Sequence, residues 1–311
     1  MVDRLKNLIR DLAAVGDGPV RTNEVLAPHT SYGIGGASAI WVAPQTESGL
    51  ARMLEIIDAD VTPLLILGRG TNLLVSDCGW PGVTLYLGRN FSSWALTGHE
   101  AEVRAGTRLP DLVQATVTRG LAGLELMAGI PGGIGGALRM NAGAFGQEIA
   151  QVTVAVRAVA LDGRRIELDR LAIHFGYREA PELASAVITA ARFRFRPEDP
   201  TILKTRRAEI LSLRAAKQPL DLPSCGSVFK RPPGYFAGAL IEQIGMKGEQ
   251  VGGAQVSRKH AGFILNVGNA TASDVYTLMR RIEKRVLDRF GIKLQREVRL
   301  VGKFGEDFFY P

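Results

Sequence analysis

The stretch Gly129–Gly146 reads G-I-P-G-G-I-G-G-A-L-R-M-N-A-G-A-F-G, and seven of its eighteen residues are glycine. Glycine loses more conformational freedom on folding than any other residue, so this density is unfavourable in an ordinary helix or strand. It is typical of backbone that turns sharply and whose N–H groups converge on an anion such as phosphate. Pro131 stiffens the entry and Asn141 adds a side-chain amide. Two interpretations are open: a loop that holds a phosphate-bearing cofactor, which we favour, and a tightly packed turn without a ligand.

A second glycine turn follows the apolar run Pro63–Gly68, which predicts a buried strand. The segment Gly68-R-G-T-N-L-L-Val75 continues directly from it and is a second candidate phosphate cradle. Leu73 stands where the third glycine of a dinucleotide fingerprint belongs, so this is not a Rossmann motif. The chain has no G-K-[S/T] sequence, which excludes a P-loop kinase or ATPase.

Composition limits the class of protein. The chain has 311 residues, 46% hydrophobic and 22% charged, which predicts a folded protein of two or three domains. The net charge of +7 suits either nucleic acid or small anionic ligands. Lysine and arginine are dispersed, and the aromatic residues, 7% of the chain, form no stacking platform. We therefore favour a small anionic ligand and expect no nucleic-acid partner.

The titratable residues predict no metal site. The two cysteines, Cys78 and Cys225, lie far apart, and the four histidines have no metal-ligand spacing. So few cysteines suit a reducing compartment. The N-terminal segment mixes charges into its apolar residues, so we read no signal peptide, and we find no membrane span. We expect a cytoplasmic protein.

Strand and helix patterns alternate irregularly, which predicts an α+β architecture. Residues 2–13 predict an amphipathic helix that packs on the body, with a partner-binding helix as the alternative. The segment around Pro197–Pro200 predicts a domain boundary. Further predicted helices are 47–59, 109–119, 203–216, 237–244 and 273–290, and further predicted strands are 39–43, 83–87, 101–105, 152–161, 165–168, 186–195, 261–267 and 292–301.

Several segments, in this order, resemble the UDP-N-acetylenolpyruvoylglucosamine reductases of bacterial cell-wall synthesis. They are Gly68–Val75, Gly129–Gly146, Phe175-G-Y-Arg178, Gly226-S-V-F-Lys230, Gly252–Asn266 and Gln295-R-E-V-Arg299. Each motif alone is weak, but the ordered set is specific and spans about His29 to Gly302.

The resemblance implies an α+β protein with an FAD-binding fold of the vanillyl-alcohol-oxidase (PCMH) type. That fold is made of two α+β subdomains and is followed by an α+β substrate-binding domain. The expected ranges are 1–28 for an N-terminal helix and lead-in, 29–197 for the FAD-binding domain, 203–302 for the substrate domain and 303–311 for a tail.

The resemblance also implies the reaction. FAD, bound non-covalently, takes hydride from NADPH, and flavin N5 delivers it to C3 of the enolpyruvyl group of UDP-N-acetylglucosamine enolpyruvate. A proton added at C2 then gives UDP-N-acetylmuramate for peptidoglycan synthesis, and thus for cell-wall biogenesis, cell shape and division during the cell cycle. Partners are this small UDP-sugar only, and we expect a monomer.

Three residues are the candidates for catalysis. Arg178 can grip the substrate carboxylate into which charge flows, because a guanidinium offers two hydrogen bonds. Ser227 is the candidate proton donor to C2. The resemblance places Glu297 near the same carbon, where it either shares the proton relay or polarises the site. Taken singly, these residues have simpler explanations as a surface cation, a turn residue and half of a salt bridge with Arg299.

The resemblance assigns the remaining site residues to two groups. FAD-binding residues are Gly68, Arg69, Gly70, Thr71, Asn72, Leu73, Gly129, Ile130, Pro131, Gly132, Gly135, Gly136, Asn141, Gly143, Ala144, Arg214 and Gly226. Substrate-binding residues are Tyr177, Lys217, Lys230, Arg231 and His260, with Lys217 at the diphosphate. Cys225 is taken as structural.

Some positions depart from the family pattern. Arg69 replaces a usual glycine and either contacts the pyrophosphate or points to solvent. Thr71 replaces a common serine, and Arg231 a usual asparagine. The short span after Arg178 indicates the branch without an extra tyrosine-bearing loop. The alternatives are another FAD-dependent oxidoreductase on this scaffold, such as an oxidase of small alcohols, and a basic nucleic-acid-binding protein.

Overall fold

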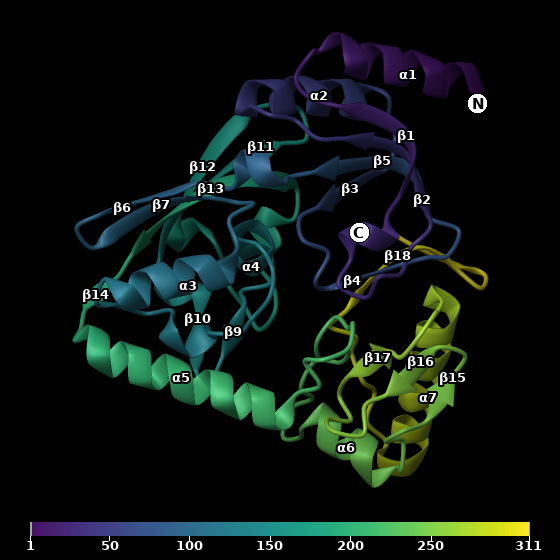
Figure 1. The fold of residues 1–311 in the computed structure, drawn as a ribbon. Helices are drawn as coiled ribbons and strands as arrows, with labels where there is room; N and C mark the ends of the chain where they lie inside the picture. Colours follow the sequence, from purple (N-terminus) through teal and green to yellow (C-terminus); the bar gives the residue numbers. More distant parts are fainter. Residues whose placement is uncertain (1, 311) are drawn as a thin grey trace. The chain divides into compact units, whose positions relative to one another are not determined.

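The computed structural model describes residues 2–310 and divides into two compact units. Among these residues, unit 1 consists of 2–22, 40–69 and 83–214, and unit 2 of 23–39, 70–82 and 215–310. Each unit has buried apolar clusters of its own: two in unit 1 and one in unit 2. Helices and strands of both units are labelled in Figure 1.

The helices of unit 1 are α1 (Val2–Ala14), α2 (Glu47–Ala59), α3 (Leu109–Thr118), α4 (Ile134–Arg139) and most of α5 (Pro200–Lys217). Its strands are β3 (Leu64–Leu67), β6 (Trp94–Thr97), β7 (Glu100–Arg104), β8 (Leu121–Ala122), β9 (Gly143–Ala144), β10 (Gln147–Glu148), β11 (Thr153–Ala160), β12 (Arg165–Asp169), β13 (Ala186–Arg194) and β14 (Arg196–Pro197). Unit boundaries fall within β1 (Val20–Val25), β2 (Ala37–Val42) and β5 (Trp80–Tyr86).

The first sheet has the strand order β1-β2-β5-β3, with β3 and β5 parallel. The helix α2 has the predicted bounds, and Thr46 caps it by accepting a hydrogen bond from the backbone N–H of Gly49. Its predicted apolar face is buried, together with Leu8 and Leu12 of α1, in one of the unit's cores. The expectation that the N-terminal helix packs on the body is therefore confirmed.

The second sheet is antiparallel, with the order β12-β11-β13-β7-β6. The predicted hairpin at Asp162-Gly163 is confirmed, because β11 pairs with β12 and Gly163 has a φ of +84°. Val103, Val156 and Ala191 lie on one face of this sheet and are buried in a core that also contains apolar residues of α3 and α4. This packing places α4 and the glycine stretch against the sheet (Figure 1).

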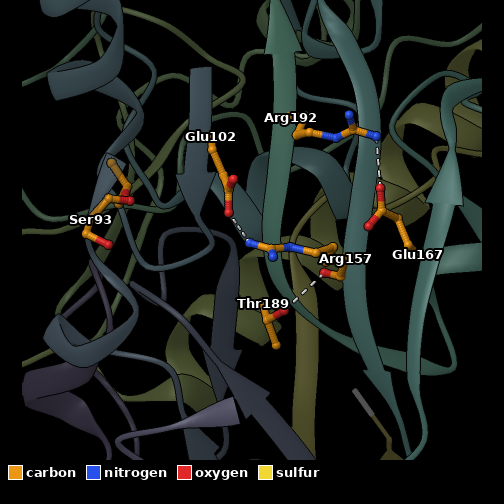
Figure 2. Close-up of polar contacts among 7 residues, drawn as sticks. Ser93, Glu102, Arg157, Glu167, Thr189 and Arg192 are labelled. Carbon is orange, nitrogen blue, oxygen red and sulfur yellow. Dashed lines mark hydrogen bonds and ion pairs between the residues drawn. The ribbon is translucent and has the colours of Figure 1, made fainter. Parts of the chain in front are cut away.

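The other face of the second sheet carries ion pairs. Figure 2 shows Arg157 of β11 contacting Glu102 of β7, and Arg192 of β13 pairing with Glu167 of β12 at 2.9 Å. Thr189 donates a hydrogen bond to the backbone carbonyl of Arg157 at 3.4 Å. Exposed pairs of this kind contribute at most about 1 kcal/mol each. These arginines have carboxylate partners on a solvated face, so they are not available as anion-binding groups.

The glycine stretch is not one continuous loop. The six-residue helix α4 occupies its middle, and β9 forms a short antiparallel pair with β10 directly after it. The helix was not predicted, because two of its six residues are glycine. It forms because Ile134 and Leu138 are fully buried in the core behind it.

Unit 2 contains the helices α6 (Ala237–Gln243) and α7 (Ala272–Phe290) and the strands β4 (Leu73–Val75), β15 (Gln250–Val251), β16 (Ala254–Val256), β17 (Ile264–Asn266), β18 (Arg299–Phe304) and β19 (Asp307–Phe309). Helix α7 begins with the predicted capping box of Thr271 and Asp274 and ends at Gly291, whose φ is +68°. Its apolar face packs on the three-stranded sheet β15-β16-β17.

The predicted strand 292–301 is wrong over its first seven residues. β18 begins only at Arg299, where it runs parallel to β4 and then pairs with β19 within the expected tail. The residues before it hydrogen-bond to another segment: the backbone N–H of Glu297 donates to the Val228 carbonyl, and that of Lys230 to the Gln295 carbonyl, both at 2.8 Å. Glu297 and Arg299 are therefore not alternate residues of one strand.

The units group the chain differently from the expected domain ranges. Helix α5 up to Arg214 belongs to unit 1, because Leu203 and Ile210 are buried in a core of that unit. Unit 2 includes residues 23–39 and 70–82, which precede most of unit 1 in the sequence. No helix within residues 2–310 is long and apolar enough to cross a membrane.

Candidate functional site

In unit 1, the second glycine cradle and the start of the first, Gly68–Arg69, both lie beside the segment Ala105–Thr107. The backbone N–H of Gly135 donates to the Ala105 carbonyl at 2.8 Å, and that of Ile134 to the Thr107 carbonyl at 2.9 Å. From the first cradle, the Arg69 guanidinium donates to the Gly106 carbonyl at 3.4 Å. The sequence left open whether Arg69 contacts a ligand or solvent, and the structure shows that one of its nitrogens contacts this linking segment.

At two positions in these cradles, neither the backbone conformation nor the packing of unit 1 requires glycine rather than a larger residue. Gly68 and Gly136 both lack a positive φ, and a Cβ added to either would meet no atom within 4 Å. Gly129 and Gly132 differ, because their φ values of +80° and +118° require glycine regardless of any ligand. Open space at Gly68 and Gly136 is what a closely approaching ligand requires, so the cradles fit a bound cofactor.

Asn141 lies at the end of the stretch and is fully buried. Its amide donates to the Glu148 carboxylate at 2.8 Å and to the Gly176 carbonyl at 2.9 Å, and its oxygen accepts from the backbone N–H of Ala150 at 3.4 Å. Both amide hydrogens are thus used within the protein. Asn141 therefore connects the stretch to the loop that carries Tyr177 and Arg178.

That loop is a tight turn in which Gly176 and Glu179 form an antiparallel bridge. Arg178 has a φ of +61°, a conformation usually taken by glycine in such turns. Its guanidinium donates to the Gly143 carbonyl at 3.1 Å and lies 5.1 Å from the centre of the Tyr177 ring. A non-glycine residue held in this region is strained by about 1–3 kcal/mol and is often functional. The structure thus brings predicted Arg178 to predicted Gly143.

Arg214 is a second cation at the same place. It is buried with only 9% of its surface exposed, near the ring of Phe145 at 5.8 Å. Burial lowers the pKa of Arg214, and the nearby charge of Arg178 lowers it further. A buried guanidinium whose charge is disfavoured by burial and by a second cation, beside the glycine stretch, marks a place where an anion is stabilised.

In unit 2, the predicted residues Ser227 and Glu297 lie on hydrogen-bonded segments. Gly226, with a φ of +75°, turns the chain so that half-buried Ser227 bridges Phe263. The next residue, Val228, accepts the hydrogen bond from the backbone N–H of Glu297 at 2.8 Å. The structure thus brings the two segments together.

Of the predicted substrate-binding residues of unit 2, two pack against neighbouring segments and two are exposed. His260 lies near Phe263, with ring centres 5.0 Å apart, and burial lowers the pKa of its imidazole. Lys230 is half-buried and next to Gln295 through a backbone hydrogen bond. Arg231 is exposed over the Phe236 ring at 4.3 Å, and Lys217 is exposed at the end of α5.

Sequence reasoning missed two polar residues of unit 2, Ser31 and Tyr32. Tyr32 is fully buried, and Ser31 contacts Cys225 at 3.4 Å across 194 positions of sequence. Burial raises the pKa of the Cys225 thiol to about 12, which keeps the thiol neutral and agrees with its interpretation as structural. No motif marks Ser31, because its partners are distant in sequence. Within residues 2–310, no group of three or more histidine, cysteine or acidic residues could hold a metal ion.

A match to a known family model identifies the class of protein to which the chain belongs. Residues 38–169 match the family model of an FAD-binding domain, a range that contains both glycine cradles. The chain is therefore an FAD-binding protein of the oxidoreductase class, and the expected α+β fold with an FAD-binding domain of the vanillyl-alcohol-oxidase type is confirmed.

The particular family follows from the rest of the chain. Residues 218–301 match the C-terminal domain of UDP-N-acetylenolpyruvoylglucosamine reductase. A relative named UDP-N-acetylenolpyruvoylglucosamine reductase 2, from Symbiobacterium thermophilum, is 43% identical over 97% of both chains. The reductase of Pediococcus pentosaceus is 41% identical over 91% of this chain and 95% of its own. The crystal structure of the Thermus caldophilus reductase, at 35% identity, has a TM-score of 0.79 and covers 91% of this chain and 99% of its own. The chain belongs to the UDP-N-acetylenolpyruvoylglucosamine reductase family.

Proposed function

We propose that this protein reduces the enolpyruvyl group of UDP-N-acetylglucosamine enolpyruvate to give UDP-N-acetylmuramate, with NADPH as the hydride donor, in peptidoglycan synthesis. The observation that carries this proposal is the pair Arg178 and Arg214, two mutually repelling cations beside a glycine stretch in an FAD-binding domain. The pair fits a site that receives both a cofactor and a carboxylate. The names of the relatives support this substrate.

FAD would be held non-covalently by the two glycine cradles. Gly68 and Gly136 leave room for its close approach, and Gly129, Pro131 and Gly132 fix the turn before α4. When bound, the flavin would carry hydride from NADPH to C3 of the enolpyruvyl double bond. The remaining residues then act on the substrate.

Arg178 would bind the substrate carboxylate. Hydride addition at C3 moves negative charge through C2 towards that carboxylate, and a fixed guanidinium stabilises the charge as it develops. The contact of Arg178 with the Gly143 carbonyl at 3.1 Å fixes its side chain before substrate arrives. Arg214 adds a second positive charge at the same place and would contact the cofactor.

Ser227 would then deliver a proton to C2 of the substrate. A serine hydroxyl is a weak acid, so it needs charge developing beside it, and positioned acid catalysis typically contributes about 10²–10⁴-fold. Glu297, on the neighbouring segment, would either relay that proton or polarise the site. Lys217, Lys230 and Arg231 offer positive charge to the diphosphate, and Tyr177 and His260 complete the substrate-binding set.

A visible absorption spectrum of the purified protein with FAD tests the proposal. We expect a flavin band that bleaches with anaerobic NADPH and returns only after UDP-N-acetylglucosamine enolpyruvate is added. A parallel titration with NADH measures the donor preference. A bleached band that ignores this substrate would indicate another oxidoreductase on the same scaffold, and no flavin binding would contradict the proposal. We also propose that the protein acts in the cytoplasm as a monomer, which size-exclusion chromatography tests.

A further inference from the structure

We infer that Ser31 is a positioning residue for Ser227: its hydroxyl fixes the start of the loop that carries the proposed proton donor. The inference rests on the proposed function of Ser227. Every residue in the argument belongs to unit 2.

Ser31 contacts two functional segments at once. Its backbone N–H donates to the carbonyl of Gly70, in the first glycine cradle, at 3.1 Å. Its hydroxyl donates to the carbonyl of Ser224 at 2.7 Å, a short hydrogen bond between residues 193 positions apart. One small residue therefore connects the cradle to the loop that begins three residues before Ser227.

Ser31 itself is held rigidly. The hydroxyl of Thr30 donates to the Ile34 carbonyl at 2.9 Å and closes a tight turn around Ser31. The next residue, Tyr32, is fully buried, and its carbonyl accepts from the side chain of Asn266 at 3.0 Å. Because the turn is fixed on both sides, the Ser31 hydroxyl is a fixed point rather than a mobile surface group.

Ser227 lies between two anchors. On its C-terminal side, Val228 is held by the backbone N–H of Glu297 and by its own N–H, which donates to the Gly262 carbonyl at 2.9 Å. On its N-terminal side, the Ser31 hydroxyl holds Ser224, and the Cys225 thiol donates to the Leu73 carbonyl at 3.1 Å. Between these two anchors, Gly226 has a φ of +75°. Glycine has the widest range of backbone conformations of any residue, so the backbone can change direction most easily at this position. Loss of the Ser31 anchor would let the loop move where its backbone is most permissive.

The substitution Ser31→Ala keeps the backbone hydrogen bond to Gly70 at 3.1 Å and removes the hydroxyl. The main loss is the hydrogen bond to Ser224 at 2.7 Å, because the other contacts of the hydroxyl, with the Gly70 carbonyl and the Cys225 thiol, are long at 3.4 Å each. We expect FAD affinity and flavin reduction by NADPH to stay within about 2-fold of the wild type. We expect the rate of flavin reoxidation by UDP-N-acetylglucosamine enolpyruvate to fall by roughly 10- to 100-fold, the effect of misplacing a catalytic group. Rapid mixing of each half-reaction measures both rates.

Ser76→Ala is the matched control. The Ser76 hydroxyl donates to the Lys303 carbonyl at 2.6 Å, so this variant also removes a long-range serine-to-carbonyl hydrogen bond of unit 2. It therefore reports the effect of lost stability alone, and both half-reactions should stay near wild type. Ser31→Thr keeps the hydroxyl and should restore reoxidation. If Ser31→Ala does not fold, Ser31→Cys, with a weaker donor, should give intermediate slowing.

A double substitution distinguishes this inference from the proposed function. If Ser31 acts through Ser227, adding Ser31→Ala to Ser227→Ala should slow reoxidation no further. Equal behaviour of Ser31→Ala and Ser76→Ala, or additive slowing in the double variant, would overturn the inference while leaving Ser227 as proton donor. If Ser227→Ala alone slows both half-reactions equally, the proposed role of Ser227 fails, and this inference fails with it.

Discussion

The side-chain amide of Asn72 donates a hydrogen bond to the backbone carbonyl of Glu297 at 3.0 Å, although 225 positions separate them in sequence. The carbonyl of Asn72 in turn accepts from the backbone N–H of Arg299 at 3.0 Å. A residue expected to bind cofactor thus fixes the backbone of a residue expected to act on substrate. Within unit 2, residues 70–75 of the first glycine cradle are therefore joined by hydrogen bonds to the last functional motif.

Substitution of Asn72 by alanine tests this link. We expect the free energy of unfolding to fall by about 1 kcal/mol, the typical contribution of one hydrogen bond. We expect reoxidation of the flavin by substrate to slow by roughly 10-fold, because Glu297 loses its fixed position. Stopped-flow measurement of both half-reactions tests this, with Gln255→Ala, at an exposed amide bonded to Gln250, as the control. Unchanged reoxidation in Asn72→Ala would show that Glu297 needs no such support.

The left-handed backbone of Arg178 predicts that two variants with the same loss of activity differ in stability. Arg178→Ala and Arg178→Gly both remove the guanidinium that contacts the Gly143 carbonyl, so both should lose substrate reduction to a similar extent. They differ in backbone strain, because the φ of +61° suits glycine and not alanine. We expect Arg178→Gly to have the higher free energy of unfolding, by about 1 kcal/mol. Chemical denaturation of the two variants measures the difference, and equal stability would mean that the turn relaxes on substitution.

The sequence predicted the elements that carry strong local signals. Helix α2 was predicted with its observed bounds, and the Thr271 capping box of α7 was visible in the sequence. Strand β1 was missed because most of its side chains are exposed, so it lacks an alternating apolar pattern. Helix α4 was missed because its glycines conceal the buried Ile134 and Leu138 that stabilise it.

The sequence predicted which motifs make up the candidate site, but it did not predict the contacts between them. Glycine density marked both cradles, but only the structure distinguishes Gly136, which leaves open space, from Gly129, which the backbone requires. The strand error at 292–298 has the same origin: those residues pair with a segment around Val228 that is distant in sequence. Long-range hydrogen bonds such as that of Ser31 to Ser224 leave no trace in local sequence patterns.

The contrast between Gly136 and Gly129 gives a test of cofactor binding that is independent of turnover. A Cβ at Gly136 meets no protein atom and lies in a helix, so Gly136→Ala should raise the free energy of unfolding of the apoprotein by about 0.5–1 kcal/mol. The same methyl group should weaken FAD binding, because it occupies space reserved for the ligand.

Gly129→Ala is the comparison. Its φ is +80°, and a Cβ there would lie 2.8 Å from Cδ of Arg214, so this variant should lose stability. Fluorescence titration of the apoproteins with FAD, alongside denaturation curves, measures both effects. Wild-type FAD affinity in Gly136→Ala would mean that the cofactor does not approach α4.

The buried thiol of Cys225 predicts a loss of stability at alkaline pH. Burial raises its pKa from 9.0 to about 12, so the folded state favours the neutral thiol. This contribution is fully present below pH 9, where the unfolded thiol is also neutral, and is lost as the pH rises from 9 towards 12. In that window the free energy of unfolding should fall by up to about 1.4 kcal/mol per pH unit.

Cys225→Ser isolates the effect, because a serine hydroxyl can still donate to the Leu73 carbonyl that the thiol contacts, and it does not titrate in this range. The pKa of the neighbouring Tyr32 is also raised by burial, and this group is present in both proteins. We expect the wild-type and variant stability curves to run parallel below about pH 9 and to converge or cross above it. Iodoacetamide should meanwhile modify exposed Cys78 in the native protein and leave Cys225 intact. Curves that stay parallel above pH 9 would mean that the folded protein admits a charged thiolate at Cys225.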